Sequence, residues 1–201
     1  MRLTSCVLGI VLLILAVPVS ADEKSGVDAE GFIQKWLVLA PIPLGADESG
    51  ATGLGREAVK DEAKLKPKAG EKVKVGDKEL AWKEITAKDH LLDFNAQLGA
   101  VTEDAIGYAV TFISAPSAMK VKMKTGSDDQ CKVWLNGTEV FKYADARPAD
   151  KDQDTTEVEL KKGVNVLVVK VVNEKVDWSF CVRFTDSDDK PITKLTAATI
   201  E

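Results

Sequence analysis

The four tryptophans are the side chains of this sequence best suited to bind a sugar. An aromatic ring packs against the C–H face of a sugar while neighbouring polar groups bind its hydroxyls. Trp36 and Trp82 lie in apolar surroundings that favour core packing. Trp134 alternates with Val133 and shares its face of the chain with a lysine. We therefore expect Trp134, and next Trp178, as ligand-binding candidates, with packing between sheets as the alternative.

The spacing of several acidic residues suggests a calcium-binding site. Asp150, Asp152 and Asp154 follow the spacing that opens an EF-hand loop. That loop requires Gly at its sixth position and Glu at its twelfth, where this chain has Thr155 and Lys161, so an EF-hand is excluded. A different all-oxygen calcium site at these residues or at Asp128 and Asp129 stays open, beside the alternative of a solvated acidic loop.

The sequence contains few residue combinations that could form a catalytic site. His90 is the single histidine, which leaves few options for histidine metal sites or for Ser/His and Cys/His catalysis. No pair of carboxylates stands out as a glycosidase pair. Residues 53–58 match G-x-G-x-x-A, but a polar loop precedes them where the dinucleotide fold needs a strand. We expect neither catalysis nor a cofactor, calcium apart.

The composition further narrows the class of protein to which this chain can belong. The chain has 201 residues, 45% of them hydrophobic, and a net charge of −5. Such a chain is neither disordered nor a general nucleic-acid binder. Its length fits one domain or at most two small ones.

Residues 1–21 have the form of a secretory signal peptide. Arg2 precedes an apolar run, and the small residues Val19 and Ala21 suit cleavage, with an uncleaved anchor as the alternative. We expect a secreted, periplasmic or cell-surface protein whose mature part, 22–201, forms one domain with no membrane span. Cleavage removes Arg2 and Cys6, leaving Cys131 and Cys181. These two form a disulfide or stay as separate buried thiols.

The elements that must position these residues are mostly strands. Apolar or alternating runs predict strands at 32–40, 79–85, 91–94, 108–113, 119–125, 164–172 and 178–184. Prolines 41 and 43 should end the first of these strands. Residues 56–65 contain good helix formers and predict one short helix. Short strands at this spacing indicate an all-β antiparallel β-sandwich or a barrel.

Residues 131–141 (CKVWLNGTEVF) carry the most specific local signal. Asn136-Gly137 between alternating apolar residues predicts a two-residue hairpin turn, because both positions need a positive φ. Leu135 should then face Thr138, and Val133 should face Val140. The same residues form an N-glycosylation sequon.

Three stretches resemble the galactose-binding-like jelly-roll module of exported, planctomycete-type bacterial proteins: GSDDQCKVWLNGTEVF (126–141), LKKGVNVLVVKVVN (160–173) and WSFCVRF (178–184). The opening FIQKWLVLAPIP (32–43) is similar to the start of the same modules, with Ala40 where Gly is common. Residues 127–137 also resemble the protective-antigen-type sugar-binding β-barrel module. The resemblance implies a jelly-roll fold and a non-catalytic, often carbohydrate-binding role at Asp128, Asp129, Trp134 and Asn136, sometimes with structural calcium.

Three functions follow as hypotheses. The first is an exported module that binds carbohydrate or an extracytoplasmic protein without catalysis. The second is a small secreted hydrolase that acts on a polysaccharide or ester through acidic residues. The third is a structural or assembly subunit of an extracytoplasmic complex. The fold itself does not choose among them.

Overall fold

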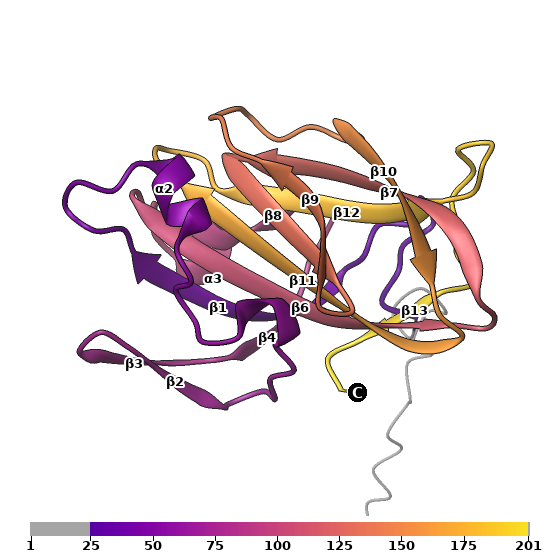
Figure 1. Cartoon of the computed structure of the whole chain (residues 1–201), viewed down its shortest axis with the longest axis horizontal. Coiled ribbons are helices and arrows are strands. Elements are labelled where there is room, and N and C mark those ends of the chain that lie inside the picture. Colours follow the sequence, from indigo (N-terminus) through magenta and orange to yellow (C-terminus); the bar gives the residue numbers. More distant parts are fainter. Residues whose placement is uncertain (1–24, 201) are drawn as a thin grey trace, which may run out of the picture.

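Two antiparallel sheets pack face to face in the computed structural model, which describes residues 25–200 (Figure 1). The large sheet has the strand order β4-β1-β6-β11-β8-β9, and β13 also pairs with β6. Its strands are β1 (Lys35–Pro43), β4 (Lys83–Thr86), β6 (Ala105–Ala115), β8 (Gln130–Leu135), β9 (Thr138–Tyr143), β11 (Gly163–Asn173) and β13 (Thr196–Ala198). The small sheet, in order β10-β7-β12-β5, contains β5 (Leu92–Asp93), β7 (Met119–Asp128), β10 (Asp154–Leu160) and β12 (Ser179–Thr185). The all-β antiparallel sandwich predicted from the sequence is confirmed.

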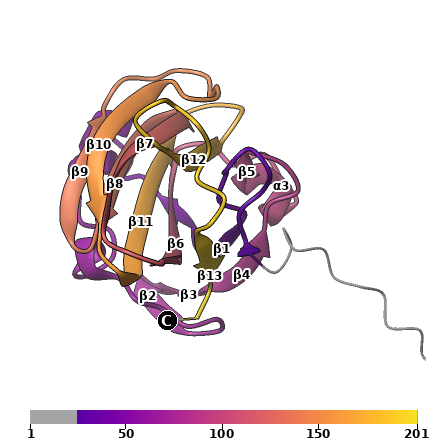
Figure 2. The same cartoon turned by 90° about the vertical axis from the view of Figure 1, so that its right-hand side faces the viewer.

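Residues 44–82 lie across the outer face of the large sheet, and we call them the cover segment. It contains the helix α2 (Gly50–Gly55), the 3-10 helix η1 (Glu62–Lys64) and the hairpin of β2 (Lys72–Val75) and β3 (Lys78–Ala81). The hairpin lies outside the two sheets at the bottom of Figure 2. The remaining helix, α3 (Phe94–Leu98), follows β5.

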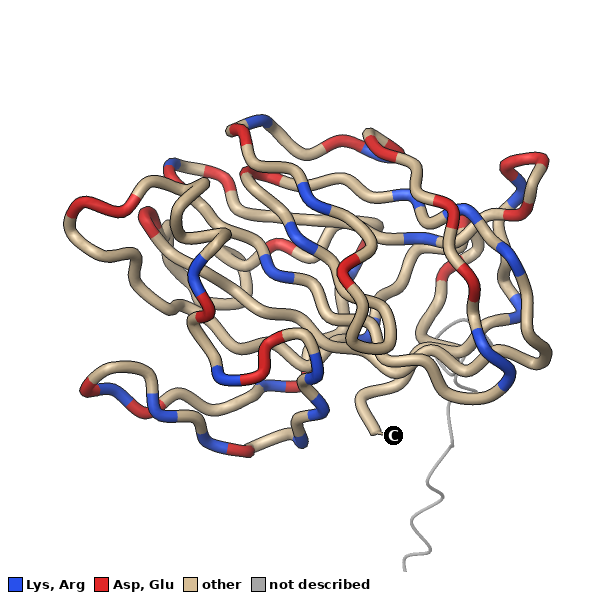
Figure 3. Tube along the Cα trace, viewed as in Figure 1, with Lys and Arg blue, Asp and Glu red and all other residues tan. Residues whose placement is uncertain are grey.

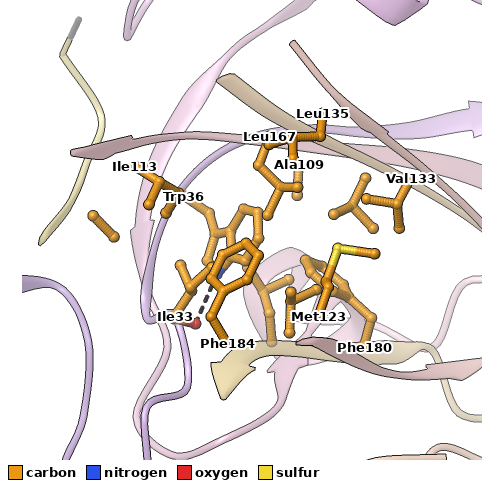
Figure 4. Close-up of a cluster of buried hydrophobic side chains, with 14 of the residues drawn as sticks. Ile33, Trp36, Ala109, Ile113, Met123, Val133, Leu135, Leu167, Phe180 and Phe184 are labelled. Carbon is orange, nitrogen blue, oxygen red and sulfur yellow. Dashed lines mark hydrogen bonds between the residues drawn. The ribbon is translucent and has the colours of Figure 1, made fainter. Parts of the chain in front are cut away.

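Two hydrophobic clusters therefore share the strands of the large sheet. One fills the space between the sheets, where Trp36 packs edge-on against Phe180 and donates a hydrogen bond to the Ile33 carbonyl (Figure 4). The other lies between the large sheet and the cover segment and contains Tyr108 and Trp82. Successive side chains of a strand point to opposite faces, so one strand supplies both clusters. The apolar runs of β6 and β11 follow from this double burial.

Two local predictions are wrong in instructive ways. β1 continues through Pro41 and Pro43, because its pairing with β4 ends at Val38 and Pro41 lies in a bulge of its pairing with β6. Residues 56–65 form no α-helix, and only Glu62–Lys64 among them are helical, as the 3-10 helix η1. Asp61 interrupts them with a φ of +56°, and its N–H is bonded to the Glu57 carboxylate.

The hairpin at 131–141 is confirmed, with one change of register. Asn136 and Gly137 both have positive φ, and Leu135 faces Thr138 as expected. A bulge between Val133 and Trp134 shifts the next pair, so Val133 faces Phe141 instead of Val140.

The predicted signal peptide, residues 1–21, lies outside the described residues. Between residues 25 and 200 no helix is both long enough and apolar enough to span a bilayer.

Candidate functional site

Trp134 lies on the outer face of the large sheet, beneath the cover segment. Val133 and Leu135 point into the core between the sheets, so Lys132 and Trp134 point the other way. The sequence predicted this alternation correctly. Of the two alternatives left open for Trp134, a ligand-binding face and packing, the structure shows packing: only 5% of its surface is accessible, because the cover segment packs on it.

A cavity of about 340 Å³ adjoins Trp134 where the cover segment crosses β8 and β9. We call it the Trp134 cavity. The strands contribute Lys132, Trp134 and Glu139 to its lining, and the cover segment contributes Glu57, Asp61, Glu62, Ala63 and Lys64. An aromatic ring surrounded by carboxylates and amines is suited to a small polar ligand.

Glu62 is fixed from below by two buried side chains. The Tyr108 hydroxyl donates to Glu62 Oε2 at 2.5 Å, and Lys170 Nζ donates to the same oxygen at 3.2 Å. Burial raises the pKa of Tyr108 and lowers that of Lys170, while the Glu62 carboxylate counteracts the shift at Lys170. No residue from 25 to 200 donates to the other oxygen, Oε1, so it is available to a ligand.

Lys132 stands between Trp134 and Glu139. Its Nζ lies 5.4 Å from the centre of the Trp134 ring and 3.7 Å from Glu139 Oε2. The second distance is longer than a hydrogen bond, so both charged groups keep capacity to bind a ligand.

Asp128 and Asp129 lie elsewhere, at the end of β7 where the chain crosses to β8. Both are 8% exposed. Asp129 accepts hydrogen bonds from the backbone N–H groups of Arg147 and Glu174, at 3.2 and 2.9 Å. Its carboxylate thus holds two loops. Burial, helped by Asp129 and Asp177, raises the pKa of Asp128 to about 6. Burial also raises the pKa of Asp129, against the effect of its two N–H donors.

Trp178 and Asn136 are occupied by structural contacts. Trp178 is 1% exposed and stacks on Phe94 with ring centres 4.4 Å apart. The Asn136 side chain donates to Asn165 Oδ1 at 2.9 Å and accepts from the Val166 N–H at 3.0 Å. The structure therefore does not gather the five sequence candidates into one site. Only Trp134 lines the cavity described above.

The calcium candidates follow β9 and are paired with other groups: Asp150 and Asp152 lie in the loop, and Asp154 begins β10. Asp152 forms an ion pair with Arg183, and Asp154 lies 2.5 Å from Arg147. Asp150 Oδ1 accepts the Lys151 N–H. Across residues 25–200, no group of three or more His, Cys, Asp or Glu side chains is arranged to hold a metal ion.

Of the two alternatives for Cys131 and Cys181, a disulfide or separate buried thiols, the structure shows the second. Cys131 points into the core between the sheets. Phe180 and Val182 point into the same core, so Cys181 between them points outward, against the Asp150 carbonyl. Burial raises the pKa of both thiols to about 12, which keeps them protonated.

Sequence reasoning missed the contribution of Glu62 and Lys132 to the cavity. One signal was present, because Lys170 interrupts an apolar strand and a buried lysine needs a carboxylate partner. The sequence did not indicate which of its 32 acidic residues would be that partner.

Comparisons with known proteins add little. No family model matches the sequence, and no curated protein is similar to it. The resemblance to galactose-binding-like modules therefore stays a prediction. Among solved structures, the chain is similar to a GH31 alpha-xylosidase from Xanthomonas citri, with a TM-score of 0.37 and 11% sequence identity. The match covers 60% of this chain and 14% of the xylosidase.

Proposed function

We propose that the protein is an exported, non-catalytic binding module of the jelly-roll kind, and that it takes a carbohydrate unit in the Trp134 cavity. The observation that carries this proposal is the cavity itself. It combines one tryptophan with the carboxylates of Glu62 and Glu139 and the amine of Lys132. These are the groups that a sugar needs, since its hydroxyls both donate and accept hydrogen bonds.

The cavity is preorganised on one side and adjustable on the other. Glu62 is fixed by Tyr108 and Lys170, so it loses little freedom when a ligand binds. Glu139 is about half exposed, and its contact with Lys132 is loose. A bound hydroxyl would replace that contact and release Lys132 from the Trp134 ring.

The test is binding of the mature protein to a glycan array, followed by calorimetric titration of each glycan that binds. We expect Glu139→Gln and Trp134→Phe each to weaken that binding about tenfold. Glu157→Gln is the matched control, since Glu157 is an exposed carboxylate on β10 outside this cavity. Unchanged thermal midpoints would show that the variants fold. The absence of any bound glycan, or affinities unchanged in both cavity variants, would refute the proposal.

A second candidate function rests on Asp128. A carboxyl group with a pKa near 6, beside a second carboxylate, has the protonation behaviour of a general acid. This favours hydrolysis of a polysaccharide or ester as the alternative. It predicts turnover of such a substrate that Asp128→Asn abolishes, whereas the binding module shows no turnover in either form.

A further inference from the structure

A row of exposed lysines runs along the cover segment. Residues 60–74 contain six lysines and three acidic residues, in a chain whose net charge is −5. All six are exposed and lie in the lower part of Figure 3. We call them the lysine ridge: Lys60, Lys64, Lys66, Lys68, Lys72 and Lys74. Residues 60–74 thus carry an excess of positive charge on an acidic protein.

The spacing of the ridge follows from its extended backbone. Leu65 and Pro67 point toward the sheet, as do Val73 and Val75 in β2, so the lysines between and beside them point outward. Alternate residues of an extended chain lie roughly 6–7 Å apart. Lys64, Lys66 and Lys68 alternate in this way, as do Lys72 and Lys74, and the turn at 69–70 separates the two groups. Each group is a short run of evenly spaced positive charges, which suits a ligand whose negative charges also repeat.

Few of these charges are neutralised within the protein. Lys60, Lys64, Lys68 and Lys74 have no ion pair with any residue from 25 to 200. Glu62, a buried carboxylate of the same segment, is bound through Oε2 by Lys170 and Tyr108.

Two further cavities border the ridge. One, of about 340 Å³, is lined by Lys64, the Asn136-Gly137 turn and Val164. The other, of about 290 Å³, is lined by Lys60, Lys74 and Trp82. With the Trp134 cavity, they flank the chain from residue 57 to residue 74. A linear ligand that crosses η1 would therefore contact a cavity on each side in addition to the lysines.

We propose that the lysine ridge binds a linear anionic polysaccharide that carries carboxylate or sulfate groups. This inference rests on the proposed carbohydrate function and deepens it by naming the class of sugar. A chain running along the ridge places its charged groups at the lysines and a neutral part at the acidic Trp134 cavity.

Two other classes of polyanion fit the ridge less well. Nucleic-acid sites favour arginine, which binds phosphate with two hydrogen bonds, and residues 60–88 contain no arginine. Membrane surfaces are bound by basic helices with an apolar face. The ridge has no helix beyond η1 and none of the exposed large hydrophobic residues.

The test compares dextran sulfate and polygalacturonate with neutral dextran, titrated against the full mature protein at several salt concentrations. The ridge variant is Lys64→Gln/Lys68→Gln/Lys74→Gln. Its matched control, Lys120→Gln/Lys142→Gln/Lys162→Gln, loses the same charge from exposed lysines outside the cover segment. We expect the ridge variant to bind both acidic polymers at least tenfold more weakly and with a smaller salt dependence, because fewer charges are screened. The control should change less than twofold.

Three outcomes would overturn the inference. These are equal losses in the two variants, binding of dextran as tight as that of dextran sulfate, or equally tight, ridge-dependent binding of duplex DNA. Any of these three results, found while a neutral glycan still binds at the Trp134 cavity, would overturn the inference and leave the proposed function standing. Failure of every polysaccharide to bind would overturn both this inference and the proposed function.

Discussion

Asp128 and Asp129 are neighbours in the sequence, yet their carboxyl groups have different surroundings. Asp129 accepts two backbone N–H groups, which stabilise its charged form. Asp128 sits beside Asp129 and Asp177, and burial raises its pKa from 3.8 to about 6. In this pair, which the sequence marks as a candidate ligand site, Asp129 is thus a hydrogen-bond acceptor for two loops. Asp128 is a buried acid with a raised pKa.

The raised pKa predicts how Asp128 affects stability. The folded state holds this proton up to about pH 6, whereas the unfolded chain releases it near pH 3.8, so ionisation costs stability as the pH rises between these values. Asp128→Asn should therefore raise the free energy of unfolding by about 1–2 kcal/mol above pH 6, allowing for solvent screening. The gain should shrink toward pH 4.

Urea denaturation of the wild type and Asp128→Asn between pH 4 and 7.5 measures this difference. Asp129→Asn is the comparison, and it should destabilise the protein, because it weakens the acceptor for two N–H groups. A gain from Asp128→Asn that stays constant with pH would contradict the shifted pKa.

The tryptophans show what a sequence pattern leaves open at this scale. Period two correctly placed Trp134 opposite Val133 and Leu135. It could not show that residues 44–82, distant in the sequence, would pack on that face. Whether a side chain is buried depends on the segment that packs against it, and the residues of the strand do not indicate which segment that is.

At the scale of elements, prediction succeeded where local physics decides the outcome. Asn-Gly needs only its own φ angles to form the hairpin turn, and alternation alone defines β7 and β12. β10 was missed because its residues, DTTEVEL, lack a clear apolar run, and its pairing with β7 supplies the missing stabilisation. The cover segment was missed because it has little regular structure and depends on contacts with the sheet.

Lys170 is the main polar contact between the cover segment and the sheet. It donates to the Leu54 carbonyl at 3.1 Å, to the Arg56 carbonyl and to Glu62. Lys170→Met leaves all three acceptors without this donor in a buried place. We expect a loss of about 3–5 kcal/mol, the usual result of breaking a buried ion pair.

The control for this prediction is Lys175→Met, because Lys175 is 63% exposed and pairs with Glu103 and Asp104 on the surface. Exposed pairs contribute about 1 kcal/mol or less. Urea denaturation gives both values, and tryptic cleavage within residues 60–74 should accelerate in Lys170→Met alone. Equal stability losses in the two variants would contradict the anchoring role.

At the scale of the whole molecule, the large sheet is the middle one of three layers. The small sheet packs on the inner face of the large sheet, and the cover segment packs on its outer face. Without the cover segment, the outer face would expose a large apolar surface, including Leu37, Tyr108 and Val168. The cover segment is thus part of the structural core as well as the support of the proposed ligand surface.

This shared arrangement predicts that the cover segment and the sandwich unfold as one cooperative unit. Trp82 reports on the outer cluster and Trp36 on the inner one, and both are buried. With 5-fluorotryptophan incorporated, the ¹⁹F signals of the two residues, assigned through Trp→Phe variants, should disappear at the same urea concentration. The physical reason is that β1, β6, β8 and β11 contribute to both clusters, so neither cluster survives loss of the other. A Trp82 signal lost at lower urea, while the Trp36 signal persists, would show instead that the cover segment detaches from an intact sandwich.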